Sequence, residues 1–297
     1  MTIIQLKGQP KDLGGGFIVR RMLPDAARRN VGPFIFFDHF GPVTALPGVN
    51  ADVRPHPHIG LATVSYLFDG AVMHRDSLGT EQRIEPGAIN WMSSGRGIVH
   101  SERRPADLRD VAYVSHGLQL WCALPRDHEE DAPFFAHTPA SAIPEVALEL
   151  AQVRVLIGDA FGVSSPVVTL FKTVYLDVEL LPGASLPLPA LAPELALYTV
   201  NGELTVDGAA MPEHRMALLP QGQPVRITAA GPARFVVVGG ESLDGPRHLW
   251  WNFVSSRKER IVQASADWEA QRIGRIAGDD EFIPLPPTRF TPPEPLS

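Results

Sequence analysis

Two segments of the sequence decide how the chain folds and what it can bind. They read Arg54-Pro55-His56-Pro57-His58-Ile59-Gly60 and Gly97-Ile98-Val99-His100-Ser101-Glu102. Side chains two residues apart on a strand point to the same face, so two such strands side by side would aim three imidazoles and a carboxylate at one point. Imidazole suits Fe, Zn, Cu or Ni, and one carboxylate oxygen shifts the preference toward Fe or Mn. A lone His-x-His pair is often only two surface or core histidines, but two such pairs together predict a metal site.

Short strands separated by turns make up most of the chain. The 297 residues include 29 prolines and 26 glycines. They separate short runs rich in Val, Ile, Leu and Phe, such as residues 63–68 and 234–238. This pattern is typical of β-sandwiches and β-barrels, and helical periodicity is scarce before residue 255. We therefore expect an all-β protein.

An internal repeat predicts two copies of one β-domain. Tyr66-Leu67-Phe68-Asp69-Gly70 is echoed by Tyr198-Thr199-Val200-Asn201-Gly202, an aromatic strand that ends in a glycine turn. We expect a metal-binding N-terminal domain at residues 1–130 and a C-terminal domain at residues 145–297. In the second copy, residues 185–189 and 225–228 stand where the metal-binding pairs should be, and they contain no histidine. The second domain is therefore predicted to be metal-free.

The C-terminal part of the chain changes character. Ser256-Arg257-Lys258-Glu259 has the pattern of a capping box, and Ile261, Ala264 and Trp268 follow at helical spacing, so a short amphipathic helix is expected over 256–272. Residues 282–287 are rich in proline and cannot be helical. They could form a proline-rich ligand motif, but an extended strap across the parent fold is the favoured interpretation.

Composition narrows the functional classes. The formal net charge of −7 argues against direct nucleic-acid binding, which needs a basic face. The longest apolar runs are too short to cross a membrane, and the first residues lack the features of a secretory signal. The single cysteine, Cys122, excludes an intramolecular disulfide and is expected to be packed. A cytoplasmic location is the expectation.

Several motifs together resemble the pirin family of the cupin superfamily. They are Gly32-Pro33-Phe34-Ile35-Phe36-Phe37-Asp38-His39-Phe40-Gly41-Pro42, Pro55 to Gly60, Ser65 to Gly70, His74-Arg75-Asp76-Ser77-Leu78-Gly79, Trp91 to Glu102, and His116-Gly117-Leu118-Gln119-Leu120-Trp121. The likeness covers essentially the whole chain, and Trp251-Asn252-Phe253-Val254-Ser255-Ser256 looks like the bacterial branch.

The resemblance implies two tandem jelly-roll-like cupin β-barrels with a metal in the N-terminal one only. By motif position, the family's metal ligands carry over to His56, His58, His100 and Glu102. It implies iron, as Fe(II), as the usual metal, while Mn, Ni, Cu, Co or Zn would also suit the donors. Many pirins have a glutamate four residues after the second histidine, where this chain has Ala62. That departure leaves the four ligands in place but puts any acid–base role at the position in doubt.

Two further histidine sites flank these motifs. His74 and Asp76 have the same i, i+2 spacing, but they run into Ser77-Leu78-Gly79 and are expected to stabilise a hairpin rather than bind a second metal. His116 begins an apolar strand. It is predicted either to hydrogen-bond a metal ligand or to be a buried neutral histidine.

Two functions from different classes follow. In the first, the protein resembles quercetin 2,3-dioxygenase: a flavonol binds the metal through its 3-hydroxyl oxygen, Glu102 takes the proton as general base, and dioxygen cleaves the heterocycle with loss of carbon monoxide. In the second, the protein is an iron-dependent, redox-responsive regulator that acts through a protein partner. A metal-free structural protein is the third alternative. Flavonol turnover discriminates between the first two.

Overall fold

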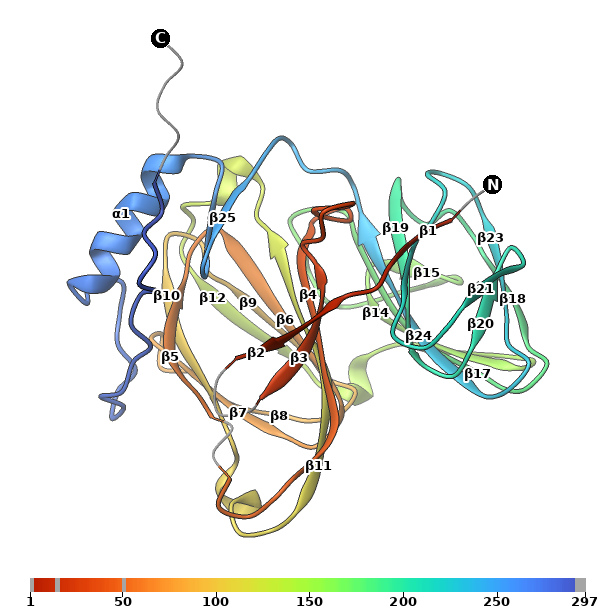
Figure 1. Ribbon diagram of the computed structural model, residues 1–297, viewed down its shortest axis with the longest axis horizontal. Coiled ribbons are helices and arrows are strands. Elements are labelled where there is room, and N and C mark those ends of the chain that lie inside the picture. The colour runs from red at the N-terminus through yellow and green to blue at the C-terminus, as the bar shows by residue number, and fades with distance from the viewer. Residues whose placement is uncertain (1–2, 14–16, 50–51, 292–297) are drawn as a thin grey trace.

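Two β-barrels lie side by side, and a single α-helix packs on the outer side of the N-terminal barrel (Figure 1). The structure is a computed structural model that describes residues 3–13, 17–49 and 52–291. The predicted all-β fold of two barrels with a short C-terminal helix is confirmed. Within the described residues, no helix is long and apolar enough to span a membrane.

The N-terminal barrel consists of two antiparallel sheets. The seven-stranded sheet has the order β12 (Phe134–Thr138), β9 (Ile89–Ser93), β6 (Leu61–Asp69), β11 (Tyr113–Ala123), β4 (Phe34–Ala45), β3 (Ile18–Leu23) and β2 (Gln9–Asp12). The four-stranded sheet has the order β5 (Val53–His58), β10 (Ile98–Arg103), β7 (Val72–Asp76) and β8 (Glu81–Ile84). Short 3₁₀ turns follow at Ala106–Leu108, Arg126–His128 and Ala140–Ala142.

The C-terminal barrel repeats this plan. Its seven-stranded sheet has the order β1 (Ile4–Leu6), β22 (Met216–Leu218), β19 (Glu194–Asn201), β24 (Ala233–Gly240), β17 (Thr173–Leu180), β14 (Ala151–Ile157) and β13 (Glu145–Leu148). Its four-stranded sheet has the order β18 (Ser185–Leu188), β23 (Val225–Thr228), β20 (Leu204–Val206) and β21 (Ala209–Met211), and β15 (Asp159–Ala160) pairs with β16 (Val163–Ser164). Strands β18 and β23 occupy the places that β5 and β10 have in the first barrel, as the repeat predicts.

Elements from the two ends of the chain are exchanged between the barrels. β1, near the N-terminus, pairs with β22 of the C-terminal barrel, whereas helix α1 (Lys258–Glu269) packs beside Ile59 and Val99 of the N-terminal barrel. These contacts describe packing and not independent folding units, so the division at residues 1–130 and 145–297 stays a prediction.

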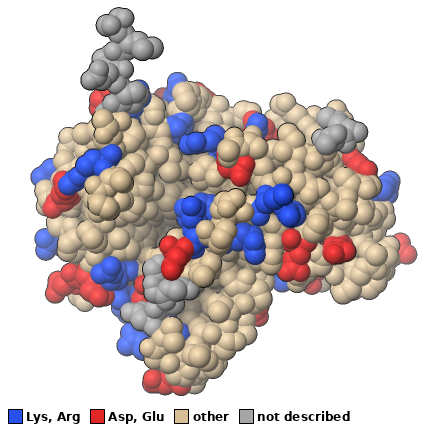
Figure 2. Space-filling model, in the orientation of Figure 1, with Lys and Arg blue, Asp and Glu red and all other residues tan. Residues whose placement is uncertain are grey.

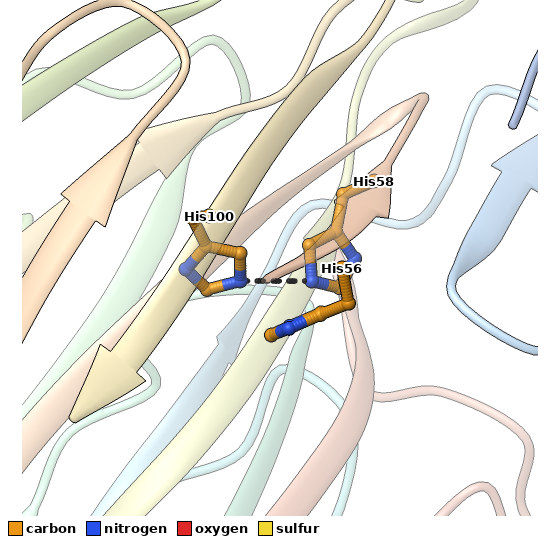
Figure 3. Close-up of side chains that lie close together, drawn as sticks. All are labelled: His56, His58 and His100. Atoms are coloured by element: carbon orange, nitrogen blue, oxygen red, sulfur yellow. Dashed lines mark hydrogen bonds between the residues drawn. The ribbon is translucent and has the colours of Figure 1, made fainter. Parts of the chain in front are cut away.

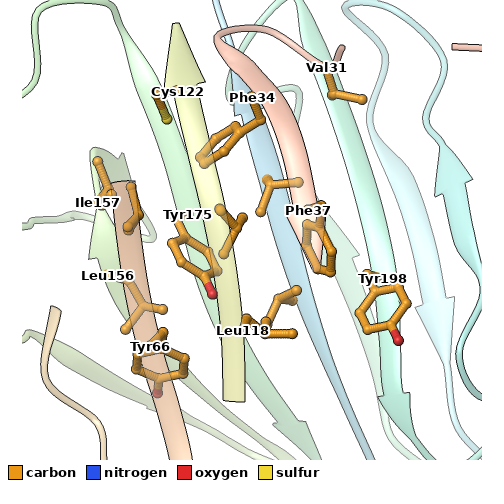
Figure 4. Packing of buried hydrophobic residues seen from close by; sticks show 14 of the residues in the cluster. Val31, Phe34, Phe37, Tyr66, Leu118, Cys122, Leu156, Ile157, Tyr175 and Tyr198 are labelled. Atoms are coloured by element: carbon orange, nitrogen blue, oxygen red, sulfur yellow. The ribbon is translucent and has the colours of Figure 1, made fainter. Parts of the chain in front are cut away.

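The largest apolar cluster lies between the barrels (Figure 4). Alternate residues of β11 divide between two environments, as the two-residue period of a strand requires. Leu118, Leu120 and Cys122 face this inter-barrel core, whereas Gln119 and Trp121 line a cavity inside the N-terminal barrel. Cys122 is buried and unpaired, which confirms that it is a packed residue.

The interiors of the two barrels differ. Apolar side chains from both sheets fill the C-terminal barrel, among them Val174, Leu186, Leu204 and Ile227. Inside the N-terminal barrel the corresponding cluster is small, with Val19, Phe40, Leu67 and Ile84 as its buried members, and a cavity of about 510 Å³ opens beside it. The interior of the first barrel therefore has room for a small molecule, whereas apolar side chains fill the interior of the second.

Helix α1 begins two residues later than predicted, and the predicted capping box is wrong. Arg257 is the N-cap residue and no side chain caps the helix. The hydroxyl of Ser256 instead donates to the buried carboxylate of Glu129, at 2.9 Å, so it is not free to cap. The predicted buried face of Ile261, Ala264 and Trp268 is confirmed.

The tail after the helix is extended, as predicted, and lies along β5. The Ile283 amide donates to the Pro55 carbonyl at 2.8 Å, and the Trp268 indole donates to the Ile283 carbonyl at 2.9 Å. Figure 2 shows acidic and basic side chains in small groups of both signs on one face of the molecule.

Candidate metal centre

Three histidines converge at one end of the N-terminal barrel. His56 and His58 lie on β5 and His100 lies on β10, where His100 pairs directly with His56 and Ile98 pairs with His58. The nitrogen ligand atoms of the three imidazoles all lie within 4.8 Å of one another, which makes this the single such group in the described part of the chain. The Nε2 atoms of His58 and His100 are 3.1 Å apart (Figure 3).

The surrounding backbone orients two of the three rings. Nδ1 of His56 lies 2.8 Å from the Arg54 carbonyl oxygen, and Nδ1 of His58 lies 3.2 Å from the Asn252 carbonyl oxygen. An Nδ1–H that donates to a carbonyl leaves the Nε2 lone pair free for a metal. Nδ1 of His100 is buried without a partner. The Nε2 atoms of His58 and His100 thus face each other at the point where the three rings converge.

Burial keeps these imidazoles neutral. It lowers the pKa of His56 to about 4. It also lowers the pKa of His58 and of His100 well below the usual value, and the neighbouring imidazoles add to this effect. Neutral imidazole is the form that binds a metal. The convergence of the three donors and their burial fit a divalent transition metal.

Glu102 does not join the three histidines in this arrangement. It follows His100 on β10 and lines the same cavity, but its carboxylate is not among the ligand atoms that lie within 4.8 Å of one another. The register of β10 against β5 shifts between His100 and Glu102, and such a bulge re-aims the following side chain. Burial raises the pKa of Glu102, partly offset by His74. Its role as a fourth ligand stays a prediction.

His74 and Asp76 form the hairpin support that their sequence context predicts. Oδ1 of Asp76 accepts hydrogen bonds from the amides of Leu78 and Thr80, at 2.9 and 3.0 Å. Nε2 of His74 lies 3.0 Å from the other carboxylate oxygen of Asp76. The His74 ring is buried and stacks on Phe135, with ring centroids 4.4 Å apart. His74 also pairs with Glu102 across the β7–β10 ladder, so this hairpin borders the metal centre.

His116 lies at the interface between the barrels and not at the metal centre. Its Nε2 is 2.9 Å from Nε2 of His39, whose Nδ1 is 2.7 Å from the Tyr198 hydroxyl of the other barrel. Burial lowers the pKa of His116 and lowers that of His39 to about 3. Of the two predicted alternatives, the buried neutral histidine is the one observed. The sequence gives no signal for the role of His39.

The cavity beside the histidines has an aromatic wall. Phe36 and Trp121 stack with ring centroids 4.0 Å apart and an interplanar angle of 11°. The Arg21 guanidinium covers the other side of Phe36 at 4.2 Å and is held by the Asp38 carboxylate at 2.7 and 2.8 Å. Trp121 in turn meets the His58 ring edge-on at 5.2 Å. The wall therefore leads from the cavity directly to a histidine of the metal centre.

Polar and charged side chains share the lining with apolar ones, among them Arg103, Arg104 and Gln119. The Ser65 hydroxyl donates to the Gln119 side-chain oxygen at 2.8 Å. Residues from the end of the chain complete the lining, namely Leu249, Trp251, Asn252 and Ile283. Sequence reasoning missed these residues, because no local pattern indicates that the end of the chain returns to the first barrel.

Comparison with known proteins identifies the family. The family model for pirin matches residues 16–122, and the one described as the pirin C-terminal cupin domain matches residues 175–274. A pirin-like protein of Caulobacter vibrioides is 46% identical over 280 residues, which cover 93% of this chain and 96% of that protein. The chain belongs to the pirin family. Human pirin is 34% identical over 270 residues, covering 88% of this pirin and 89% of the human protein.

Solved structures agree with this assignment. The crystal structure of a quercetin 2,3-dioxygenase from Acinetobacter baumannii superposes with a TM-score of 0.89 at 32% identity, covering 98% of this chain and 96% of that one. The two barrels of this pirin are thus cupin barrels. Ala62, where many pirins are expected to have glutamate, is buried in the inter-barrel core. Its side chain lies on the far side of β6 from the cavity, so the departure leaves the metal centre untouched.

Proposed function

We propose that this pirin cleaves a flavonol such as quercetin with dioxygen, using one divalent metal held by His56, His58, His100 and Glu102. The observation that carries the proposal is the position of three neutral, buried imidazoles at a largely apolar cavity of about 510 Å³. Ligand pockets for small molecules have volumes of roughly 300–1,000 Å³. The likeness to the Acinetobacter baumannii quercetin 2,3-dioxygenase supports the choice of substrate.

The metal, when bound, would act as a Lewis acid that stabilises the deprotonated 3-hydroxyl of the flavonol. The chain's own residues supply the rest. The three imidazoles stay neutral because they are buried. A metal therefore does not have to displace a proton from their ligand nitrogens. The aromatic wall of Phe36 and Trp121 matches the planar rings of a flavonol. We propose iron as Fe(II), and the donor set also suits Mn, Ni, Cu, Co or Zn.

Glu102 is proposed as the general base. Its carboxylate lines the cavity two residues after His100, and burial raises its pKa. Released from the metal, the buried carboxylate would accept the proton of the flavonol hydroxyl as general base. The same burial favours the neutral acid once the proton has been transferred. Glu102 would thus hold the substrate proton within the cavity during the reaction.

The test is flavonol turnover by Glu102→Gln. This variant keeps the shape of the side chain and a weak oxygen donor but cannot accept the proton. We expect it to retain much of its metal and to lose turnover by roughly 10²–10⁴-fold. Glu81→Gln, in the same sheet with its side chain 57% exposed, is the control and should behave like the wild type.

Near-normal turnover by metal-loaded Glu102→Gln would show that Glu102 is not the base. If the wild-type protein, loaded in turn with each of the six metals, cleaves no flavonol, the dioxygenase proposal is wrong. That second result would favour the redox-responsive regulator as the function.

A further inference from the structure

The chain returns to the N-terminal barrel after it has completed the second one. β25 (His248–Trp250) and β26 (Phe253–Ser255) form a hairpin that lies against the N-terminal barrel in Figure 1. Phe253 bridges to Ile59, and the Val254 amide donates to the Ile59 carbonyl at 3.1 Å. Ile59 directly follows His58, so the hairpin is attached at the end of the strand that carries two of the histidines.

The turn of this hairpin is strained at Trp251. The two-residue turn consists of Trp251 and Asn252, and Trp251 has a φ of 52°. Turns of this length need a positive φ at their first central residue, which asparagine or glycine usually provides. A bulky aromatic residue in the left-handed region is an outlier that costs free energy, and such outliers cluster at functional sites. A role in the site would account for tryptophan at this position.

The turn contacts the site in two ways. The Asn252 carbonyl oxygen lies 3.2 Å from Nδ1 of His58 and accepts its proton. The neighbouring Trp251 side chain lines the cavity and is steadied by an edge-on contact with Phe253, with ring centroids 5.3 Å apart. One strained turn therefore holds a metal-ligating imidazole and places an indole in the same cavity.

We propose that Trp251 is a specificity-determining residue that selects substrates with an aryl group beyond the metal-binding oxygens. The inference rests on the proposed function and states that the hairpin contacts the aryl group of the flavonol. Phe36 and Trp121 line the cavity from the barrel wall, whereas Trp251 reaches it from outside the barrel sheets. A planar aryl ring would contact aromatic side chains from both the barrel wall and the hairpin. A small chelating molecule without that ring would bind without contacting Trp251.

The test compares two ligands on the zinc-loaded protein under anaerobic conditions. Quercetin and maltol carry the same 3-hydroxy-4-carbonyl chelating group, but maltol lacks the aryl ring. Isothermal titration calorimetry gives both affinities for the wild type, Trp251→Gly, Trp251→Phe and a control, Trp250→Leu. Glycine adopts the positive φ without strain, so Trp251→Gly removes the indole and keeps the turn. Trp250 belongs to the same hairpin but lies outside the lining of the cavity.

We expect Trp251→Gly to bind zinc and maltol like the wild type and to bind quercetin about tenfold more weakly, the size of a lost aromatic contact. Trp251→Phe should recover most of the affinity for quercetin, and Trp250→Leu should leave both affinities unchanged. Unchanged quercetin binding by Trp251→Gly would overturn the inference, as would equal weakening of both ligands or loss of zinc. If the wild type cleaves quercetin but Trp251→Gly binds it normally, only this inference fails. If the wild-type protein binds neither ligand, the proposed function fails and the inference falls with it.

Discussion

At the scale of single residues, burial decides the protonation state of the histidines. The metal-centre imidazoles and the inter-barrel pair of His39 and His116 are all buried, and desolvation disfavours their charged forms. At the candidate metal centre a neutral ring is able to bind a metal. Between the barrels a neutral ring is a hydrogen-bonding group that joins β4 to Tyr198 of the second barrel. The same physical effect therefore serves binding at one place and packing at the other.

The histidine at the barrel interface makes stability depend on pH. Burial, as the largest cause, lowers the pKa of His39 to about 3, and the nearby guanidinium of Arg20 adds to this effect. Below pH 6.5 the unfolded chain therefore takes up a proton that the folded protein does not bind until about pH 3. The free energy of unfolding should fall as the pH decreases through this window, by up to about 1.4 kcal/mol per pH unit for this residue.

Urea unfolding of metal-free wild type and His39→Gln at pH 7 and pH 5 measures this contribution. The variant loses hydrogen bonds and should be less stable at pH 7, but the gap should narrow by about 2 kcal/mol at pH 5 because glutamine does not titrate. His128→Gln, whose side chain is 43% exposed, serves as the control. A constant gap between wild type and His39→Gln would contradict this explanation.

At the scale of elements, strand β5 and the β25–β26 hairpin that packs against its end form one structural unit. Gly60 follows β5 and has a φ of 68°, and a Cβ atom there would lie 2.0 Å from the Val254 carbonyl oxygen. The absence of a Cβ atom at Gly60 therefore allows the β25–β26 hairpin to approach the end of the strand. The approach in turn brings the Asn252 carbonyl to His58.

Gly60→Ala should push the hairpin away from β5. Gly79 also has a positive φ but has open space around it, so Gly79→Ala reports the backbone strain alone, roughly 1–2 kcal/mol. We expect Gly60→Ala to lose roughly 1–3 kcal/mol more than this in the free energy of unfolding. It should also bind metal more weakly because His58 loses its hydrogen-bonding partner. Equal losses in the two variants, measured by urea unfolding and zinc titration, would contradict a close approach at Gly60.

Elements also show what the sequence can and cannot predict. The i, i+2 pairs predict that His56 shares a face with His58, because the two-residue period is a property of any strand. The same reasoning places Glu102 with His100, but the bulge in β10 depends on its pairing with β5, which the local sequence does not reveal. Likewise, the carbonyl of Asn252 acts through the backbone, so its side-chain identity gives no signal. Ser256 matches a capping pattern, but its hydroxyl donates a hydrogen bond to the carboxylate of Glu129, which is distant in the sequence.

At the scale of the whole molecule, one fold is used twice for different purposes. The second barrel is filled with apolar side chains, and its sheet buries one face of the first barrel against the inter-barrel core. The repeat predicts the two barrels, and the missing histidines predict that only the first binds a metal. They do not predict that the end of the chain returns to close the first barrel, because that contact joins residues far apart in the sequence. The C-terminal segment thus completes the lining of the cavity beside the candidate metal centre.

The central claim is that His56, His58 and His100 hold a metal, and the most direct test is metal analysis of protein purified without a histidine tag. Plasma mass spectrometry should find about one divalent transition metal per chain in the wild type, consistent with a single group of converging donors. His128→Ala, which removes an exposed histidine, should keep that metal. His58→Ala should retain little of it. Full stoichiometry in His58→Ala, or no metal in the wild type even after reconstitution, would contradict the account.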